Sequence, residues 1–364
     1  MATWPVTGGV LEASQLHRWH EAFTCLARVE LRTWRRPLLR PRRYALDGSQ
    51  ALRHGAGPGD VPSLVAVTVD PDRAAVHTAR TAADAVMIGR FDAERTVRLR
   101  AYYGGGRRGP STLRVQGFEP GGHGGVERSI RAAQAIARHA PGFAPRLLDH
   151  GTDERRGVAF LREECVDGTH PANREAMRSV APLIAERLRA LQSGVGITVA
   201  PLSRLSSSQL LERWDSFAAD EDVTPTLHRR VRRLLERDAL LEVSLGHGDP
   251  VSSNIVLPAG AVVGDRLMLI DWEHARRMPV GMDLAKLHHQ SADPTTTVEE
   301  LRRSAGSATP PRGTYTFTEQ LAIAHVLMLS WYERRRQRAA AVGRLEPLAR
   351  DTRRRVALVD ELLG

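Results

Sequence analysis

The chain has 364 residues, of which 42% are hydrophobic and 26% are charged, and these proportions are ordinary for a globular protein. A chain of this length exceeds the size at which single cores usually stop growing, so two lobes are expected. No apolar run approaches the roughly 20 residues that a membrane span needs, and no secretory signal pattern opens the sequence. Two cysteines, Cys25 and Cys165, are too few for a disulfide framework, so we expect a cytoplasmic protein with reduced thiols.

The charge of the chain is basic, with 52 Lys and Arg residues against 42 Asp and Glu residues and a net charge of +10. Lys286 is the only lysine, so nearly all of this positive charge is arginine. The arginines gather at 28–43 and 334–355, which are either solvated faces or surfaces that attract anions. No nucleic-acid-binding motif is recognisable among them, so no nucleic-acid partner is expected.

The N-terminal half of the chain is rich in predicted strands. Apolar spacing predicts a helix at 13–34, and turn-forming residues predict a loop at 47–62. Apolar and β-branched runs predict strands at 63–69, 85–91, 96–103 and 111–118. The Gly-rich segment 119–125 leads into a predicted helix at 126–140. The stretch 147–168 is typical of a strand, a turn and a second strand.

From about residue 172 the pattern becomes mainly helical. Apolar residues recur at helical spacing in the stretches 173–192, 206–220, 226–241, 316–336 and 347–363. Two short apolar strands joined by a turn interrupt this series within 247–275. A strand-rich half followed by a helical half predicts an α+β protein with two lobes.

The most informative segment is HGDPVSSN (247–254), which is followed by an aspartate 17 residues after Asn254. Asp249 and Asn254 are five residues apart and can meet across one loop, with the aspartate facing a hydroxyl group and the asparagine a metal ion. Asp271, at the end of the next strand, adds an anionic oxygen ligand to the same metal. Magnesium suits this set, because it takes one or two protein oxygens and completes its shell with phosphate and water. The pattern therefore favours phosphoryl transfer, which needs positioning, charge neutralisation and an acceptor for the hydroxyl proton.

Together, HGDxxxxN, IDWE (270–273) and GMDLA (281–285) resemble the aminoglycoside phosphotransferase and choline kinase family, whose members are relatives of the protein kinases. The resemblance implies that Asp249 is the catalytic base, that Asn254 and Asp271 hold Mg²⁺, and that ATP is the phosphoryl donor. It also implies that His247 and Asp283 have structural roles beside the site.

The same resemblance implies a two-lobe protein-kinase-like fold. We expect an N-terminal extension at 1–85, a small β-rich nucleotide-binding lobe at 86–166, and a larger, mainly helical catalytic and substrate-binding lobe at 167–364.

Members of this family grip the nucleotide phosphates with a basic strand residue that pairs with a helix glutamate. Because Lys286 lies beyond the catalytic motif, the basic residue is expected to be an arginine. Arg114 with Glu127 as its helix partner is our prediction, and Arg100, one strand earlier, is the alternative.

Two further segments are candidates for nucleotide contacts. The Gly-rich 104–109 covers the phosphates or is simply a hairpin turn. The segment 162–168 resembles the family's hinge, so the backbone around Glu164 and Val166 is expected to meet the adenine edge.

Three hypotheses for the function remain open. The first is transfer to a hydroxyl of a small molecule, either an aminoglycoside or a neutral or anionic metabolite. Four acids at Asp215, Asp220, Glu221 and Asp222 suit the aminoglycoside, whereas the basic composition argues against it. The second is a Ser/Thr kinase for a ribosomally made precursor peptide, with the basic N-terminal region docking an acidic peptide or protein. The third is a non-catalytic pseudokinase scaffold.

Overall fold

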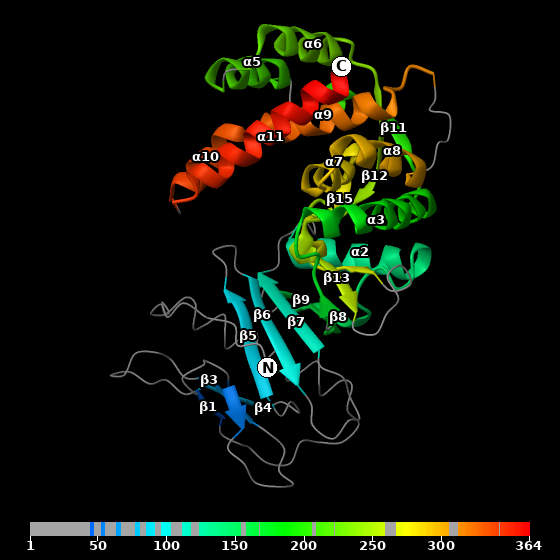
Figure 1. Cartoon of the computed structure of the whole chain (residues 1–364). Coiled ribbons are helices and arrows are strands. Elements are labelled where there is room, and N and C mark those ends of the chain that lie inside the picture. The colour runs from blue at the N-terminus through cyan, green and yellow to red at the C-terminus, as the bar shows by residue number, and fades with distance from the viewer. Residues whose placement is uncertain are drawn as a thin grey trace. The chain divides into compact units, whose positions relative to one another are not determined.

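The computed structural model describes residues 124–364 except 154–157, 167, 206–208, 222, 259–266, 306–311 and 342, and before residue 124 it describes strands only. The chain divides into two units (Figure 1). Unit 1 comprises Met1–Gln134 and Pro145–Val166, and unit 2 comprises Ala135–Ala144 and Asp167–Gly364. The helix expected at 13–34, the basic stretch 28–43 and the Gly-rich 104–109 lie outside the described residues.

Unit 1 contains a seven-stranded sheet with the order β1-β2-β5-β6-β7-β9-β8 among its described residues. The strands are β1 (Tyr44–Leu46), β2 (Leu52–His54), β5 (Ala85–Phe91), β6 (Thr96–Tyr102), β7 (Ser111–Gly117), β8 (Leu147–Asp153) and β9 (Val158–Glu164). Every neighbouring pair is antiparallel. A separate hairpin joins β3 (Ser63–Ala66) and β4 (His77–Arg80).

Most of this sheet follows the sequence pattern. The strands expected at 85–91, 96–103 and 111–118 are confirmed as β5, β6 and β7. The expectation of an uninterrupted loop at 47–62 is wrong, because β2 lies within it and pairs with β5. A turn-rich composition hides a strand of only three residues, which is too short to show an alternating pattern.

Helix α2 (Gly125–His139) begins against this sheet. Val126 packs with Ala159 and Leu161 of β9 in one buried cluster. Gln116 of β7 extends its side chain to the helix start, where its Oε1 accepts a hydrogen bond from the backbone N–H of Val126 at 2.8 Å. Because the first N–H groups of a helix have no partner within the helix, this contact fixes α2 to one face of the sheet.

Unit 2 is mainly helical in its described residues (Figure 1). Its helices are α3 (Arg174–Val195), α4 (Leu202–Leu205), α5 (Leu210–Asp220), α6 (Pro225–Glu236), α7 (Gly281–Gln290), α8 (Pro294–Ser304), α9 (Phe317–Leu329), α10 (Tyr332–Ala341) and α11 (Leu345–Leu363). None of the described helices is both long enough and apolar enough to cross a membrane.

Two small sheets accompany these helices. The first has the order β10-β13-β14, with β10 (Gly168–Thr169), β13 (Ile255–Pro258) and β14 (Met268–Leu269). The second has the order β11-β12-β15, with β11 (Thr198–Pro201), β12 (Leu240–Gly246) and β15 (Arg276–Pro279). Both are antiparallel, and they carry the loops on which the candidate site is built.

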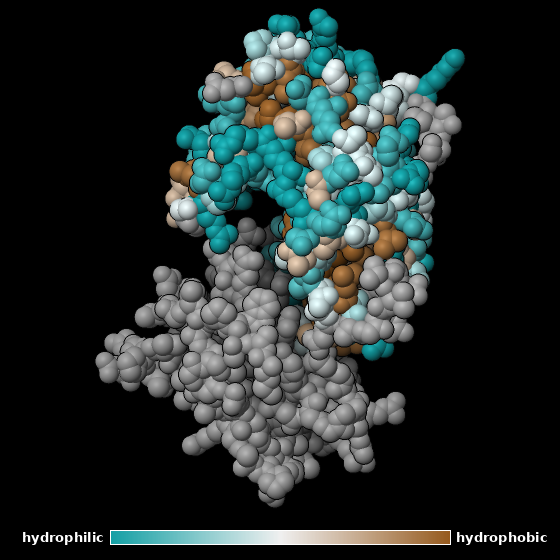
Figure 2. Space-filling model, in the orientation of Figure 1, coloured by the Kyte–Doolittle hydropathy of each residue, from teal (hydrophilic) through white to brown (hydrophobic). Residues whose placement is uncertain are grey.

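The core of unit 2 lies between α5, α6, α9 and α11 and is centred on fully buried Trp214. Trp214 packs on Phe217 with ring centroids 5.6 Å apart. In the space-filling view, hydrophilic residues cover most of the visible described surface, and hydrophobic residues show in groups near the top and at the lower right of the coloured part (Figure 2). Burial of this apolar face is the main stabilising term for such helices.

Two helix boundaries differ from the expectation. The helix expected at 226–241 ends at Glu236, and the residues from Leu240 form β12. Asp238 causes this break: it adopts a left-handed backbone with φ of 43°, and its carboxylate accepts hydrogen bonds from Ser203. The helix expected at 316–336 is two helices, α9 and α10, which divide after Leu329.

Candidate active site

The HGDPVSSN segment follows β12 directly, and β12 is the central strand of its sheet. Residues from two antiparallel strands are brought together beside it, because Ile255 of β13 is paired with Leu269 of β14. One residue beyond this pair, the N–H of Ile270 donates to the carbonyl oxygen of Asn254 at 2.9 Å. Asn254 and Asp271 therefore leave the same end of one hairpin, as the spacing of the motif predicts.

His247 is completely buried and connects the two halves of the site. Its Nδ1 accepts from the N–H of Asp249 at 3.1 Å, so its Nε2 carries the proton that is donated to the carbonyl oxygen of Ile270 at 2.8 Å. The ring also packs edge-on against Trp272, with centroids 4.5 Å apart. Burial lowers the pKa of His247, so the neutral ring that this pattern requires is the stable form.

Asp283, near the start of α7, holds the backbone of the same loop. Its carboxylate is 1% exposed and accepts from the N–H of His247 at 2.7 Å and from the N–H of Gly248 at 2.8 Å. Gly248 has a φ of 84°, and a Cβ there would lie 2.7 Å from the carbonyl oxygen of His274. Glycine is therefore required at this turn, and Asp283 pairs with both N–H groups that the turn presents.

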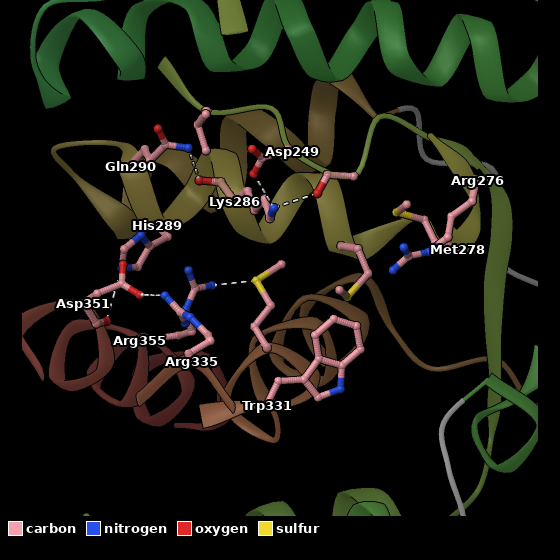
Figure 3. A pocket seen from close by; sticks show the side chains of 14 residues that line it. Asp249, Arg276, Met278, Lys286, His289, Gln290, Trp331, Arg335, Asp351 and Arg355 are labelled. Atoms are coloured by element: carbon pink, nitrogen blue, oxygen red, sulfur yellow. Dashed lines mark hydrogen bonds and ion pairs between the residues drawn. The ribbon is translucent and has the colours of Figure 1, made fainter. Parts of the chain in front are cut away.

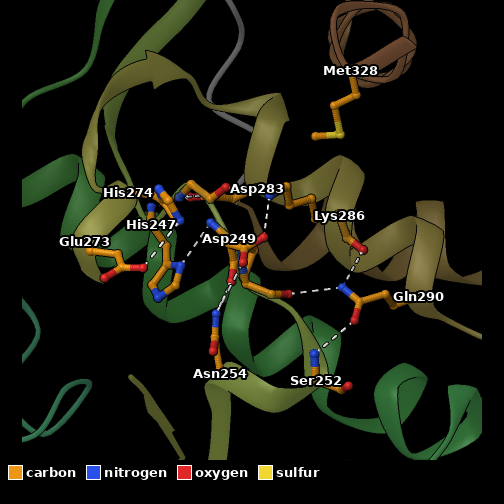
Figure 4. A network of polar contacts seen from close by, with 12 residues as sticks. His247, Asp249, Ser252, Asn254, Glu273, His274, Asp283, Lys286, Gln290 and Met328 are labelled. Atoms are coloured by element: carbon orange, nitrogen blue, oxygen red, sulfur yellow. Dashed lines mark hydrogen bonds and ion pairs between the residues drawn. The ribbon is translucent and has the colours of Figure 1, made fainter. Parts of the chain in front are cut away.

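Asp249 and Asn254 lie together, as the sequence predicts (Figure 4). The Nδ2 of Asn254 donates to the backbone oxygen of Asp249 at 2.9 Å and lies 3.5 Å from its Oδ2. Asp271 has a left-handed backbone with φ of 70° and ψ of 53°, which is uncommon outside glycine and frequent at functional turns. These contacts engage the amide nitrogen of Asn254 and not its amide oxygen. An amide oxygen from Asn254 and a carboxylate from Asp271 have the donor chemistry that fits Mg²⁺.

Lys286 is a member of the site that the motif analysis missed. Its Nζ lies 2.6 Å from Oδ1 of Asp249 and 2.6 Å from the carbonyl oxygen of Gly248. The signal was present in the sequence, because Lys286 follows Asp283 by three residues and so lies on the same face of α7. Its position after the motif excludes it as the phosphate-gripping strand residue, and the sequence analysis assigns it no other role, whereas α7 returns it to Asp249.

A cavity of about 500 Å³ within unit 2 opens beside Asp249 (Figure 3). Its lining residues come from the HGDPVSSN segment (247–254), which we call the catalytic loop, and from β15, α7, α9, α11 and the segment at the start of α10. They include Asp249, Met278, Lys286, Met328, Trp331 and Arg355. A group held in this cavity can reach the carboxylate of Asp249.

In unit 1, Arg114 is 2% exposed and forms an ion pair with Glu163 of the neighbouring strand at 3.4 Å. Arg114 opposes Leu161 and Gln116 opposes Ala159, so Arg114 shares the sheet face that carries Gln116 and α2. The expected partner Glu127 is also buried, but its two carboxylate oxygens accept no hydrogen bond from the described residues.

Among the described residues, the ion pair of Arg114 is with Glu163 and not with the predicted Glu127. Glu163 opposes Thr112, two residues from the Arg114–Leu161 pair, and therefore presents its carboxylate on the same face within reach of the guanidinium. The carboxylate of Glu127 lies instead beside Gly124 at the start of its own helix. Arg100 lies on β6 opposite Thr112, so its backbone position is two residues along the adjacent strand from the position opposite Arg114.

The predicted hinge residues lie at the end of unit 1. The N–H of Glu164 donates to the carbonyl oxygen of Arg146 at 3.0 Å, and its side chain accepts from the N–H of Arg146 at 3.2 Å. The Glu164 N–H is therefore engaged within the sheet. Val166 is the last residue of unit 1, so it remains a candidate for adenine contact.

Of the acids considered for an aminoglycoside site, the three described ones, Asp215, Asp220 and Glu221, are not among the residues that line the cavity beside Asp249. Asp215 is engaged elsewhere, with its Oδ1 2.7 Å from Nε2 of His228 and its Oδ2 accepting from Arg232 at 3.1 Å. The residues that line the cavity include four cationic side chains instead: Arg276, Lys286, Arg335 and Arg355.

Comparison with solved structures gives matches of low sequence identity. Choline kinase LicA from Streptococcus pneumoniae is 14% identical with a TM-score of 0.49, and the match covers 76% of this chain and 93% of that chain. Macrolide 2'-phosphotransferase MphH from Brachybacterium faecium is 14% identical with a TM-score of 0.45 and coverages of 73% and 91%. A choline/ethanolamine kinase family protein from Mesorhizobium loti is 19% identical with a TM-score of 0.43 and coverages of 76% and 92%.

No curated protein sequence matches the chain. The model of one protein family, described as the phosphotransferase enzyme family, matches residues 90–315. This match includes the β-rich part from the end of β5 and the whole catalytic loop, and it confirms the two-lobe, protein-kinase-like α+β fold expected from the sequence. The chain belongs to the phosphotransferase enzyme family.

Proposed function

We propose that this protein transfers the terminal phosphoryl group of ATP to a hydroxyl group of a small molecule. The observation that carries the proposal is the position of Asp249, which lines a cavity of about 500 Å³. Its carboxylate lies 2.6 Å from Nζ of Lys286 and 3.5 Å from Nδ2 of Asn254. A base at the wall of a cavity of this size is the arrangement that transfer to a small acceptor needs.

The chemistry divides among these residues as follows. The acceptor hydroxyl oxygen forms a bond to the terminal phosphorus of ATP, the bond from that phosphorus to the bridging oxygen breaks, and ADP leaves. Asp249 orients the hydroxyl and takes its proton late, because the transition state of phosphoryl transfer is loose. Lys286 holds the Asp249 carboxylate in one orientation through the 2.6 Å contact.

Other residues hold the reactants. Asn254 and Asp271 would bind Mg²⁺, which neutralises charge on the phosphate groups when it is bound. Arg114, fixed in unit 1 by Glu163, is our candidate for the cation that grips the nucleotide phosphates. Asp283 and His247 act through the backbone of the loop that carries Asp249.

Mass spectrometry of phosphate transfer tests this proposal. The purified full chain is offered Mg²⁺-ATP with a pool of hydroxylated small molecules, and separately with a pool of Ser/Thr-containing precursor peptides. We expect a mass increase of one phosphate group in the small-molecule pool only. Transfer in the peptide pool alone would favour the precursor-peptide kinase, and ATP binding without transfer to either pool would favour the pseudokinase.

The matched variants are Asp249→Asn and Asp360→Asn. Asp249→Asn keeps the shape of the side chain but removes the proton acceptor, so turnover should fall by about three orders of magnitude or more. Asp360 lies on α11 with its side chain 54% exposed, outside the cavity lining, and its substitution should leave turnover unchanged. Near-normal turnover of Asp249→Asn would overturn the assignment of the base.

A further inference from the structure

The charge of the cavity beside Asp249 is unusual for a site that accepts a polycation. Arg276, Lys286, Arg335 and Arg355 contribute four positive charges to its lining, whereas Asp249 and Asp351 contribute two negative charges. His289 also lines the cavity, and burial lowers its pKa to about 3, so it adds no charge at neutral pH. The lining is therefore net positive.

The two carboxylates are already engaged. Asp249 contacts Lys286 at 2.6 Å. Asp351 contacts Arg335 at 2.7 Å through one oxygen and His289 at 3.1 Å through the other. Arg276 and Arg355 therefore have no carboxylate partner among the described residues.

Arg355 is the more deeply buried of these two cations, with only 5% of its surface exposed. One of its terminal nitrogens lies 3.0 Å from Nδ1 of His325 and 2.9 Å from Sδ of Met328, and its Nε has no hydrogen-bond partner among the described residues. Burial lowers its pKa only to about 10, so the group stays charged at neutral pH. The charge of Asp351 partly offsets this effect on the pKa of Arg355, but Asp351 makes no direct ion pair with it among the described residues. A buried cation without a direct ion pair is costly, and an anionic ligand in the cavity that it lines would offset that cost.

Apart from Gln290 and the backbone of Gly248, the rest of the lining is apolar. Met278, Met282 and Met328 contribute flexible thioether side chains, and Trp331 stands at the cavity with 50% of its surface exposed. Figure 3 shows Trp331 across the cavity from Lys286 and Asp249, with Arg335 and Arg355 to one side and Arg276 on the other. An exposed tryptophan with methionines suits an apolar or aromatic body, because sulfur and indole both pack well against rings.

We propose that the acceptor is a small hydroxylated acid whose anionic group is held by Arg355 together with Arg335, while Arg276 adds positive charge on the other side of the cavity. Its apolar body lies against Trp331 and the methionines, and its hydroxyl faces Asp249. This inference rests on the proposed function, since it names the acceptor class for that site. An aminoglycoside polycation is excluded from this cavity by repulsion from the same arginines.

A matched set of probes tests the charge preference without turnover. All four probes share an aromatic body and differ in charge. Two are anions, phenylpropionate and phenyl phosphate; phenylpropionamide is neutral and phenylpropylamine is a cation. Their binding to the full chain is measured by calorimetry without nucleotide. We expect at least one anion to bind about tenfold or more tightly than the amide, and the amine to bind more weakly still. Whichever anion binds more tightly indicates whether the acceptor carries a carboxylate or a phosphate.

Variants localise the effect. Arg276→Gln and Arg335→Gln should each reduce the preference for the anion over the amide by about threefold or more. Arg302→Gln removes a guanidinium of the same kind from an exposed pair on α8, outside the cavity, and should leave the preference unchanged. Arg355→Met should abolish most of the preference, and its urea midpoint shows whether the fold survives. If Arg355→Met does not fold, the anion preferences of Arg276→Gln and Arg335→Gln still test the inference.

Equal affinity for anion and amide, tighter binding of the amine, or no saturable binding of any probe would each overturn the inference. Titration with Mg²⁺-ATP, carried out on the same preparation, tests the proposed function separately. ATP binding without an anion preference removes the acid acceptor and leaves the phosphotransferase. An anion preference without ATP binding supports an acid-binding cavity and removes the phosphotransferase.

Discussion

The ammonium group of Lys286 lies 2.6 Å from Oδ1 of Asp249 and, at the same time, 2.6 Å from the carbonyl oxygen of Gly248. The two residues belong to different elements, the catalytic loop and α7, so the contact sets the direction of the Asp249 carboxylate relative to the helix. Lys286 also lines the cavity, which places a positive charge where a phosphoryl group would approach the acceptor.

Replacement of Lys286 by methionine should lower kcat by about 100-fold, because the carboxylate loses its fixed orientation and the transferred group loses a neighbouring cation. The affinity for Mg²⁺-ATP should change little. Steady-state kinetics and calorimetry measure the two quantities. Lys286→Arg should restore part of kcat, since it keeps the charge, and equal loss in both variants would argue for a purely structural lysine.

Asp283→Asn should destabilise the protein by about 2 kcal/mol or more. The carboxylate of Asp283 accepts hydrogen bonds from two backbone N–H groups, and in the variant an amide NH₂ would face one of these two donors and leave it without an acceptor. Urea denaturation of the variant and the parent gives this difference. Asp293→Asn serves as a control at a half-buried helix start, where the amide oxygen can still accept the N–H of Thr296. A midpoint for Asp283→Asn that matches this control would contradict the loop-holding role.

Arg114→Gln should weaken Mg²⁺-ATP binding by about tenfold while leaving the affinity for the acceptor unchanged. Glu163→Gln should have a smaller effect in the same direction, since it frees the guanidinium that it now holds at 3.4 Å. Calorimetric titration with ATP compares these variants with Arg100→Gln. If Arg100→Gln alone weakens ATP binding, the phosphate-gripping residue lies on β6.

The stability of the protein should fall in mild acid. Burial lowers the pKa of His288 to about 4, that of His289 to about 3, and those of His247 and His325 below the ordinary value. Between about pH 6.5 and pH 4 the unfolded chain therefore binds more protons than the folded chain. Each of these histidines lowers the free energy of unfolding by up to about 1.4 kcal/mol per pH unit as pH falls, and above about pH 6.5 the contribution is fully present.

Urea denaturation at pH 7 and pH 5 measures this dependence. His288→Gln should reduce the difference between the two pH values, because it removes one proton-uptake site from the unfolded chain. His274→Gln, at an exposed position, should leave the difference unchanged. An unaltered pH dependence in His288→Gln would show that carboxylates, not buried histidines, dominate the acid response.

The local pattern predicted much of the fold and the centre of the site. Antiparallel strands such as β5 to β7 carry alternating or β-branched residues, and the long helices carry apolar spacing, so each is specified within its own segment. Asp249 and Asn254 share one loop, and the hairpin that follows brings Asp271 to the same end. These contacts span few residues, so motif spacing was sufficient to predict them.

Contacts between distant segments were not predictable in this way. Glu163 is 49 residues from Arg114, and only the pairing of β7 with β9 places it on the same face. Lys286 is 37 residues from Asp249 and reaches it through the packing of α7. The cavity arginines come from β15 and from the helical residues at 335 and 355, where the sequence shows only a general excess of basic residues.

Because Lys286 is the only lysine, its amine can be modified selectively. Every other basic side chain except the histidines is a guanidinium, so the amine of Lys286 and the chain's α-amino group are the two targets that acylating or reductively alkylating reagents would find. A reagent that modifies many surface lysines in other proteins would here modify the amine beside Asp249, the candidate base. The extent of its modification, with and without an occupant in the cavity, could be read from a single peptide.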